Sequence, residues 1–350
     1  MAASNIPLRQ LGKNGPILPR LGVGLMGASG VYGLPASDAA RLAFLDGAYS
    51  IGETFWDTAD EYNDSEDVIG KWFAANPEKR EDIFLATKFG IISDFHNPAG
   101  VPVNSSPEYC KQALDKSLKR LGLPFVDLYY VHRLDGKTPI EKTIEAMVEL
   151  KDAGKIKYIG LSECSADSLR RAHAVHPITC VQVEYSAFCL AIESPEFNLL
   201  KTARELGVAI VAYSPLGNGI LTGSLRKSED FSKPGDLRHH MPWLKDENLQ
   251  TNLGIVDKLT ELAASKGATT PQLALAWLMA QGDDIFAIPG TKSLDRLKED
   301  LASLDFSISP KEDETIRKLS GQVAGERVQN MTGELGLDLY DYPKEHDNYI

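Results

Sequence analysis

The feature that most constrains this chain is an alternation of short apolar runs with amphipathic stretches, which continues almost to the last residues. This βαβα order is typical of a parallel sheet covered by helices. It predicts eight strands, at residues 21–25, 54–58, 83–88, 126–132, 158–161, 180–183, 209–213 and 285–288. Because eight such units close a (β/α)8 TIM barrel, we expect this α/β fold.

The stretches between the strands have the apolar spacing of helices, as at residues 106–121 and 139–153. Before the first strand, residues 7–11 and 16–19 flank the turn-forming sequence Gly-Lys-Asn-Gly. Such a turn between two short apolar runs predicts an N-terminal β-hairpin on the floor of the barrel.

One domain is expected over residues 1–350, because no linker or low-complexity tract divides the chain. The barrel should occupy about residues 8–320, followed by extra helices and a C-terminal tail at 321–350. This tail and a polar stretch at about 216–249 exceed a minimal barrel, and both could shape a pocket.

Composition and charge narrow the classes of function. No run of about 18 apolar residues predicts a membrane span, the N-terminus lacks a signal-peptide core, and the four cysteines have no metal or redox spacing, so we expect a cytoplasmic protein. A net charge of −12 without a Lys/Arg run argues against a nucleic-acid partner. The seven histidines do not form a zinc- or iron-binding motif with acidic or thiol ligands, so no metal site is expected.

Residues 22–27 spell G-x-G-x-x-G directly after a predicted strand, which by itself would indicate a dinucleotide-binding Rossmann unit. That unit requires a helix to begin immediately, whereas residues 28–35 contain two more glycines and a proline. We therefore interpret the motif as a tight turn beside a bound ligand, with Gly24 and Met26 as candidate cofactor contacts.

Four polar residues lie where predicted strands end or just beyond, which is where barrel enzymes carry their reactive groups. They are Asp57, Tyr62, Lys88 and His132. Reduction of a carbonyl by hydride leaves an alkoxide that needs a proton, and a phenol with a pKa of about 10 is a poor acid at neutral pH. We predict that Lys88 lowers the pKa of Tyr62, that Asp57 keeps Lys88 charged, and that His132 aligns the carbonyl. The alternative is a structural ion pair and a satisfied buried histidine.

The segments F-W-D-T-A-D-E-Y, A-T-K-F-G, Y-Y-V-H-R, Y-I-G-L-S-E, V-Q-V-E-Y, A-Y-S-P-L-G and I-P-G-T-K-S resemble the signatures of the aldo-keto reductase superfamily over about residues 8–304. H-R-L-D-G-K-T-P-I-E-K-T and K-I-K-Y-I-G-L-S-E look most like the branch of fungal pyridoxal reductases and aryl-aldehyde reductases. The resemblance implies NADP(H)-dependent reduction of a small aldehyde or ketone, with Tyr62 as the general acid.

The resemblance also implies the cofactor contacts. Ser162 and Gln182 would hold the nicotinamide carboxamide, and Tyr213 would stack on its ring. The pyrophosphate would lie on the backbone of Ser214, Leu216, Gly217 and Gly219. Gly290 opens a turn into a helix whose Lys292, Ser293 and Arg296 would meet the 2′-phosphate of NADPH, while Glu299 and Asp300 would reach the adenine.

Three residues depart from the pattern of the superfamily. Asn63 stands where glycine is usual, and Glu163 and Asp300 each replace a common asparagine. Asn63 tolerates a left-handed backbone, so the loop should keep its geometry. Glu163 lies next to the expected contact with the nicotinamide carboxamide, and Asp300 lies at an expected contact with the adenine.

Other functions and substrates are left open by the sequence. A nucleotide-binding regulatory subunit resembling potassium-channel β-subunits is one alternative, and an aldolase that uses Lys88 as a Schiff-base nucleophile is another. Pyridoxal, aryl aldehydes, methylglyoxal-like compounds and secondary-metabolite ketones are all candidate substrates. An aromatic set could line the pocket or belong to the core: Phe55, Trp56, Phe89 and Tyr130. The sequence does not decide between a monomer and a homo-oligomer.

Overall fold

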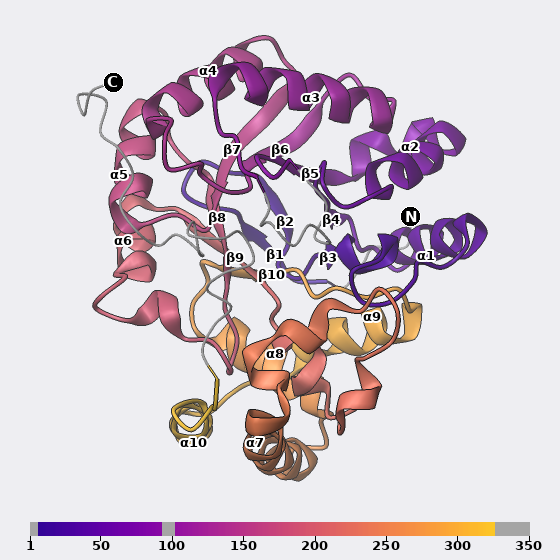
Figure 1. Cartoon of the computed structure of the whole chain (residues 1–350), viewed down its shortest axis with the longest axis vertical. Coiled ribbons are helices and arrows are strands. Elements are labelled where there is room, and N and C mark those ends of the chain that lie inside the picture. Colours follow the sequence, from indigo (N-terminus) through magenta and orange to yellow (C-terminus); the bar gives the residue numbers. More distant parts are fainter. Residues whose placement is uncertain (1–5, 93–101, 326–350) are drawn as a thin grey trace.

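A ring of parallel strands forms the centre of the molecule (Figure 1). The computed structural model describes residues 6–92 and 102–325, and within them eight parallel strands lie side by side in chain order. These strands are β3 (Val23–Gly24), β4 (Phe55–Asp57), β5 (Phe84–Phe89), β6 (Val126–Val131), β7 (Ile156–Ser162), β8 (Cys180–Glu184), β9 (Ala209–Tyr213) and β10 (Ile285–Ala287).

The sheet closes on itself between its first and last strands. Parallel bridges join Leu21 to Ala287 and Gly24 to Gly290. The amide of Gly24 donates to the carbonyl of Pro289 at 3.1 Å, a contact that requires glycine because a Cβ there would lie 2.9 Å from the Ile288 carbonyl oxygen. The closed (β/α)8 TIM barrel is thus confirmed, and the predicted strands all form.

Helices surround this barrel (Figure 1). They are α1 (Asp38–Ser50), α2 (Ser65–Ala75), α3 (Pro107–Leu121), α4 (Ile140–Asp152), α5 (Ala166–Val175), α6 (Leu199–Leu206), α7 (Asp246–Ser265), α8 (Thr270–Ala280), α9 (Leu294–Leu301) and α10 (Pro310–Ser320). Their starts follow from local capping chemistry, as at α3, where the Ser106 hydroxyl accepts from the Tyr109 amide. The helix begins and ends within one residue of the prediction, and Gly122 ends it in the left-handed conformation.

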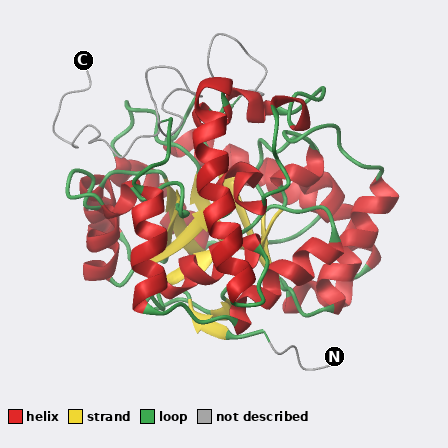
Figure 2. Cartoon of the chain, turned by 90° about the horizontal axis from the view of Figure 1, so that it is seen from below, coloured by secondary structure: helices red, strands yellow, loops and turns green. Residues whose placement is uncertain are grey.

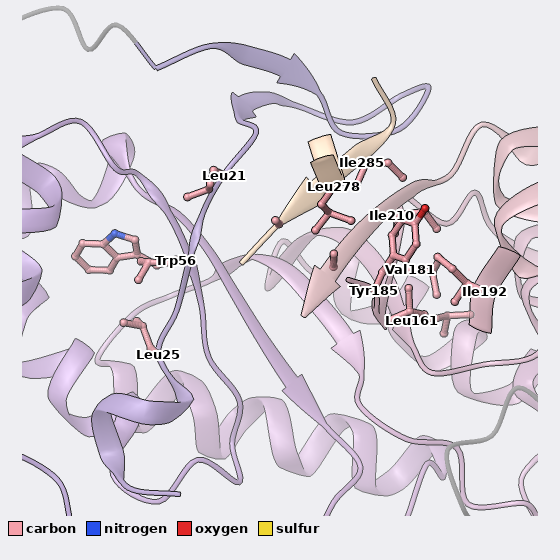
Figure 3. Packing of buried hydrophobic residues seen from close by; sticks show 14 of the residues in the cluster. Leu21, Leu25, Trp56, Leu161, Val181, Tyr185, Ile192, Ile210, Leu278 and Ile285 are labelled. Carbon is pink, nitrogen blue, oxygen red and sulfur yellow. The ribbon is translucent and has the colours of Figure 1, made fainter. Parts of the chain in front are cut away.

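The core has two layers, because side chains alternate across each strand. Inward residues such as Phe55, Leu128, Tyr130 and Phe286 form a cluster inside the barrel. Outward residues pack beneath the helices, and Figure 3 shows Leu161, Val181 and Ile210 on three neighbouring strands in this outer layer.

A two-stranded hairpin covers the floor of the barrel, seen at the lower edge of Figure 2. Its strands are β1 (Leu8–Gln10) and β2 (Ile17–Pro19), paired antiparallel. Leu11 and Leu18 join the inner core, and the Lys13 amide donates to the Gly207 carbonyl at 2.8 Å. The predicted hairpin is confirmed.

The G-x-G-x-x-G motif does not open an α-helix. Residues Met26–Ser29 form a short 3-10 turn, and the next α-helix begins only at Asp38. The interpretation of this motif as a turn, and not as a Rossmann unit, is confirmed by the barrel around it.

Two segments exceed a minimal barrel, as the sequence predicts. The stretch after β9 contains short 3-10 turns at Gly217–Thr222, Ser228–Asp230, Leu237–His240 and Pro242–Leu244, and then continues into α7. The predicted tail is described only to residue 325, so most of it lies outside the described residues. Within the described part, no helix has the length and hydropathy of a membrane span, and no cluster of His, Cys, Asp and Glu has the geometry of a metal site.

Candidate active site

A cavity of about 720 Å³ opens at the carboxyl ends of the barrel strands. The predicted site residues that line it are Gly24, Met26, Asp57, Tyr62, His132, Ser162, Gln182, Tyr213, Ser214, Leu216, Gly219, Gly290, Lys292, Arg296, Glu299 and Asp300. Three others lie behind its wall: Lys88 is fully buried beneath Asp57 and Tyr62, Gly217 is buried in its turn, and Ser293 caps α9. The structure thus brings most of the predicted residues to one cavity.

Lys88 is the centre of a buried polar chain. Its ammonium group forms an ion pair with Asp57 and donates hydrogen bonds to the Thr58 carbonyl at 2.8 Å and the Tyr62 hydroxyl at 3.3 Å. The other oxygen of Asp57 accepts from the Gln182 side-chain amide at 2.8 Å. Each polar group of the chain is therefore held by another. Asp57, Tyr62 and Gln182 line the cavity, whereas Lys88 is fully buried behind them.

Burial dominates the electrostatics of this chain. It lowers the pKa of Lys88 and raises that of Asp57, while each partner opposes the shift of the other. Burial raises the pKa of Tyr62 well above its ordinary value, and the Asp57 and Glu61 carboxylates raise it further. The expected net lowering of the Tyr62 pKa is not found, because desolvation, the largest cause, raises this pKa although the Lys88 ammonium donates to the phenol oxygen. Tyr62 is consequently a protonated phenol at neutral pH, which is the form that donates a proton.

His132 faces Tyr62 across the cavity, with ring centroids 5.7 Å apart in an edge-on arrangement. Its backbone amide donates to the Phe89 carbonyl at 2.7 Å, which fixes its place beyond β6. Burial lowers the pKa of His132 well below its ordinary value, and Arg133 and Lys88 add to this effect. The imidazole is therefore neutral at pH 7, and its Nδ1 has no hydrogen-bond partner within the described residues.

The loop that carries Tyr62 is fixed from two sides. Asn63 adopts the left-handed conformation at φ 46°, as predicted, and its side-chain amide donates to the Ser29 carbonyl at 2.9 Å. From α3, Arg120 donates to the carbonyls of Asp60 and Asn63, the former at 2.8 Å. These contacts hold the backbone on both sides of the phenol.

Ser162 and Gln182 lie opposite each other in the register of β7 and β8. The Ser162 hydroxyl accepts from the Arg133 guanidinium at 3.2 Å, and the Gln182 amide nitrogen is bonded to Asp57. Glu163 is also left-handed, at φ 49°, and its buried carboxylate accepts from the Glu184 amide at 2.9 Å. Glutamate at this position thus has a structural role within the loop.

The segment after β9 forms a series of left-handed turns at the cavity wall. Ser214, Gly217, Asn218 and Gly219 have φ values of 47°, 55°, 55° and 98°. Such a run turns successive backbone amides toward a concave surface, which suits an anion such as a pyrophosphate.

A cluster of cations lies at the start of α9. Lys292 and Arg296 are exposed residues of the cavity wall, and neither forms an ion pair among the described residues. Burial and the nearby Arg238 lower the pKa of Lys292. The Ser293 hydroxyl accepts from the Arg296 amide at the helix start. Unpaired cations at a helix N-terminus fit a phosphate group, so this donor set suits the 2′-phosphate of NADPH.

Next to these cations, Asp300 is buried at the cavity wall. Burial, with a contribution from Glu299, raises its pKa to about 7. A carboxyl group that is half protonated near neutral pH can donate a hydrogen bond, as an asparagine amide does.

Sequence reasoning missed other residues of the wall, among them Tyr32, Arg133, Asn218 and Arg238. The Asn218 amide donates to the Tyr32 hydroxyl at 3.0 Å, and an antiparallel bridge joins Tyr32 to Asp236. This pairing of distant loops has no local signal, whereas Arg133 directly follows His132 at a strand end and could have been found.

The aromatic set proposed either for the pocket or for the core belongs to the core. Phe55 and Tyr130 are fully buried inside the barrel, and Trp56 and Phe89 are fully buried beneath the helices. None of the four lines the cavity.

Comparison with known proteins assigns the class. The chain matches the Aldo/keto reductase family over residues 20–320. It is 45% identical over 346 residues to the aldo-keto reductase str7 of Strobilurus tenacellus, covering 97% of this chain and 99% of the relative. It is 44% identical over 347 residues to the Schizosaccharomyces pombe protein named aldo-keto reductase yakc (NADP(+)). This match covers 97% of this chain and 100% of the relative. The chain therefore belongs to the aldo/keto reductase family, and the predicted resemblance is confirmed.

Solved structures agree with this assignment. A thermostable aldo-keto reductase in complex with the inhibitor epalrestat superimposes with a TM-score of 0.70 at 29% identity, covering 90% of this chain and all of the other. The glycerol dehydrogenase AKR11B4 of Gluconobacter oxydans gives a TM-score of 0.78 at 25% identity, covering 92% and 97%.

Proposed function

We propose that this protein catalyses the NADPH-dependent reduction of an aldehyde or ketone to an alcohol, with Tyr62 as the proton donor. The observation that carries the proposal is the buried chain from Asp57 through Lys88 to Tyr62, which reaches the cavity beside a neutral His132. Membership of a reductase family, and a relative whose name includes NADP(+), support it.

NADPH, when bound, supplies the hydride. The residues of this chain then handle the carbonyl oxygen. His132 is neutral and can donate a hydrogen bond that orients this oxygen, and Tyr62 gives it a proton as negative charge develops. Lys88 donates to the Tyr62 hydroxyl and so stabilises the phenolate that is left, while Asp57 keeps Lys88 in place.

The cofactor contacts follow from the shape of the cavity. Ser162 and Gln182 would hold the nicotinamide carboxamide, Tyr213 would stack on the ring, and the turns at residues 214–219 would hold the pyrophosphate. Lys292 and Arg296, with Ser293 as the cap of α9, would bind the 2′-phosphate, which favours NADPH over NADH. Gly24, Met26 and Gly290 would lie along the cofactor, and Glu299 and Asp300 would reach its adenine.

We propose pyridoxal or an aryl aldehyde as the substrate, on the basis of the motif resemblance, with the whole chain acting as one domain. The aldolase alternative is disfavoured, because a Schiff-base lysine must meet the substrate, whereas Lys88 is fully buried and ion-paired. The regulatory-subunit alternative is also disfavoured, because a protein that only binds nucleotide does not need Asp57, Lys88 and Tyr62 arranged to donate a proton.

The test follows the near-ultraviolet absorbance of NADPH with the purified protein and a panel that includes pyridoxal and nitrobenzaldehyde, with NADH in parallel. We expect NADPH oxidation that is lost in Tyr62→Phe and kept in Tyr158→Phe. The control removes a phenol hydroxyl near the start of β7, beside the inner core and outside the cavity wall. Tight NADPH binding without turnover would favour the regulatory subunit, and no NADPH binding would overturn the proposal.

A further inference from the structure

Arg133 lies in the cavity wall directly after His132, beyond the end of β6. Its Nη1 atom donates to the His132 carbonyl at 2.7 Å and to the Ser162 hydroxyl at 3.2 Å. Gly90, at φ 128°, permits this arrangement, because a Cβ there would lie 2.9 Å from the Arg133 carbonyl oxygen. Arg133 is therefore held in place, with its remaining donors not engaged by any described residue.

No carboxylate in the described part of the chain forms an ion pair with Arg133. Asp135 is only two residues away, but it accepts from the amides of Ser105, Lys137 and Thr138 and from the Thr138 hydroxyl. In contrast, the ammonium of Lys88 is paired with Asp57 and the guanidinium of Arg238 with Asp236.

The positive charge of Arg133 affects the pKa values of three residues of the proposed active site. It lowers the pKa of His132 and Lys88 beyond the effect of burial, and it partly opposes the rise in the pKa of Tyr62. An arginine with free donors, half-buried beside the proton donor, is the usual partner of a carboxylate or a phosphate.

We infer that Arg133 forms an anion subsite for the substrate, so that the enzyme prefers carbonyl compounds that carry a carboxylate or phosphate group near the reacting carbonyl. This inference rests on the proposed reductase function. The subsite differs from the cationic cluster of Lys292 and Arg296, which lies at the start of α9 and would bind the cofactor.

The experiment compares substrates that differ in charge but little in size. Steady-state constants are measured with NADPH for 4-carboxybenzaldehyde against 4-carbamoylbenzaldehyde, and for pyridoxal 5′-phosphate against pyridoxal. The variants are Arg133→Gln and Arg133→Lys, with Arg170→Gln as the matched control, because Arg170 pairs with Glu205 on the outer face of the barrel. NADPH affinity is measured by fluorescence for each variant.

The wild type should show a lower KM for the anionic member of at least one pair, and which pair shows it identifies a carboxylate or a phosphate as the preferred group. Arg133→Gln should raise that KM by about 30-fold, the usual range for loss of a hydrogen bond between charged groups. The KM of the neutral aldehyde and the affinity for NADPH should change far less, Arg133→Lys should recover part of the loss, and Arg170→Gln should match the wild type.

Equal KM values for anionic and neutral aldehydes in the wild type would overturn the subsite and leave the reductase function standing. An equal loss on both kinds of aldehyde in Arg133→Gln would also overturn it, since it would indicate a structural or cofactor role. Absence of turnover with every aldehyde in the wild type would overturn the proposed function and the subsite together.

Discussion

On the catalytic side of the cavity, the Lys88 ammonium is fully buried and paired with Asp57, whereas on the phosphate side Lys292 and Arg296 are exposed and have no acidic partner among the described residues. A buried charge is expensive unless it is paired, so the fully buried Lys88 ammonium requires the Asp57 carboxylate beside it. A site that takes up an anion needs unpaired positive charge. The same residue types thus have opposite surroundings, as the proposed function requires: one side would orient a proton and the other would attract a phosphate.

Breaking the buried pair should have the largest effect. Lys88→Met leaves Asp57 buried without its partner, so we expect a free energy of unfolding lower by about 3 kcal/mol and a kcat lower by about a thousandfold. Chemical denaturation and steady-state kinetics measure the two effects. In the double variant Lys88→Met/Asp57→Leu, stability should recover and activity should not. A single variant as stable as the wild type would contradict the claim that the pair is mutually dependent.

On the phosphate side, the same type of substitution should affect binding and leave stability nearly unchanged. Lys292→Met should weaken NADPH binding by about 30-fold, since it removes a charge-assisted contact. NADH binding should change little, because NADH lacks the 2′-phosphate. Fluorescence titration checks both, with Lys298→Met as the control, because Lys298 is an exposed lysine of α9 outside the cavity wall. Equal losses of affinity for NADPH and NADH would indicate that Lys292 contacts a part of the cofactor other than the 2′-phosphate.

The smallest effect should come from Asp300, whose pKa is raised to about 7. Its carboxyl group is neutral below that pH and negatively charged above it, and Arg296 and Glu299 are its charged neighbours. NADPH affinity relative to that of Asp300→Asn should therefore fall by about threefold between pH 6 and pH 8, as the added charge repels the phosphates. Using the ratio cancels the titration of the phosphate itself, and a ratio independent of pH would show that Asp300 does not titrate in this range.

The sequence predicted the barrel because alternation of apolar runs is a local pattern repeated along the whole chain. It also predicted that Asp57, Tyr62, Lys88 and His132 come together, because strand ends meet at one face of a barrel. It did not predict the environment of Tyr62, since burial depends on how distant segments pack, and the pKa moved opposite to the expected direction. For the same reason it could not decide whether inward residues such as Phe55 and Tyr130 lie in the core or in the cavity wall. The pairing of Tyr32 with Asp236 joins loops about two hundred residues apart, which no local pattern encodes.

The central claim is direct hydride transfer to a carbonyl with Tyr62 as the acid. The most direct test supplies NADPH labelled with deuterium at both C4 positions of the nicotinamide and analyses the alcohol product by mass spectrometry. The account predicts one deuterium on the carbinol carbon with the wild type and with Tyr158→Phe, and product formed about a thousandfold more slowly with Tyr62→Phe. An alcohol without deuterium, or a Tyr62→Phe variant as fast as the wild type, would contradict it.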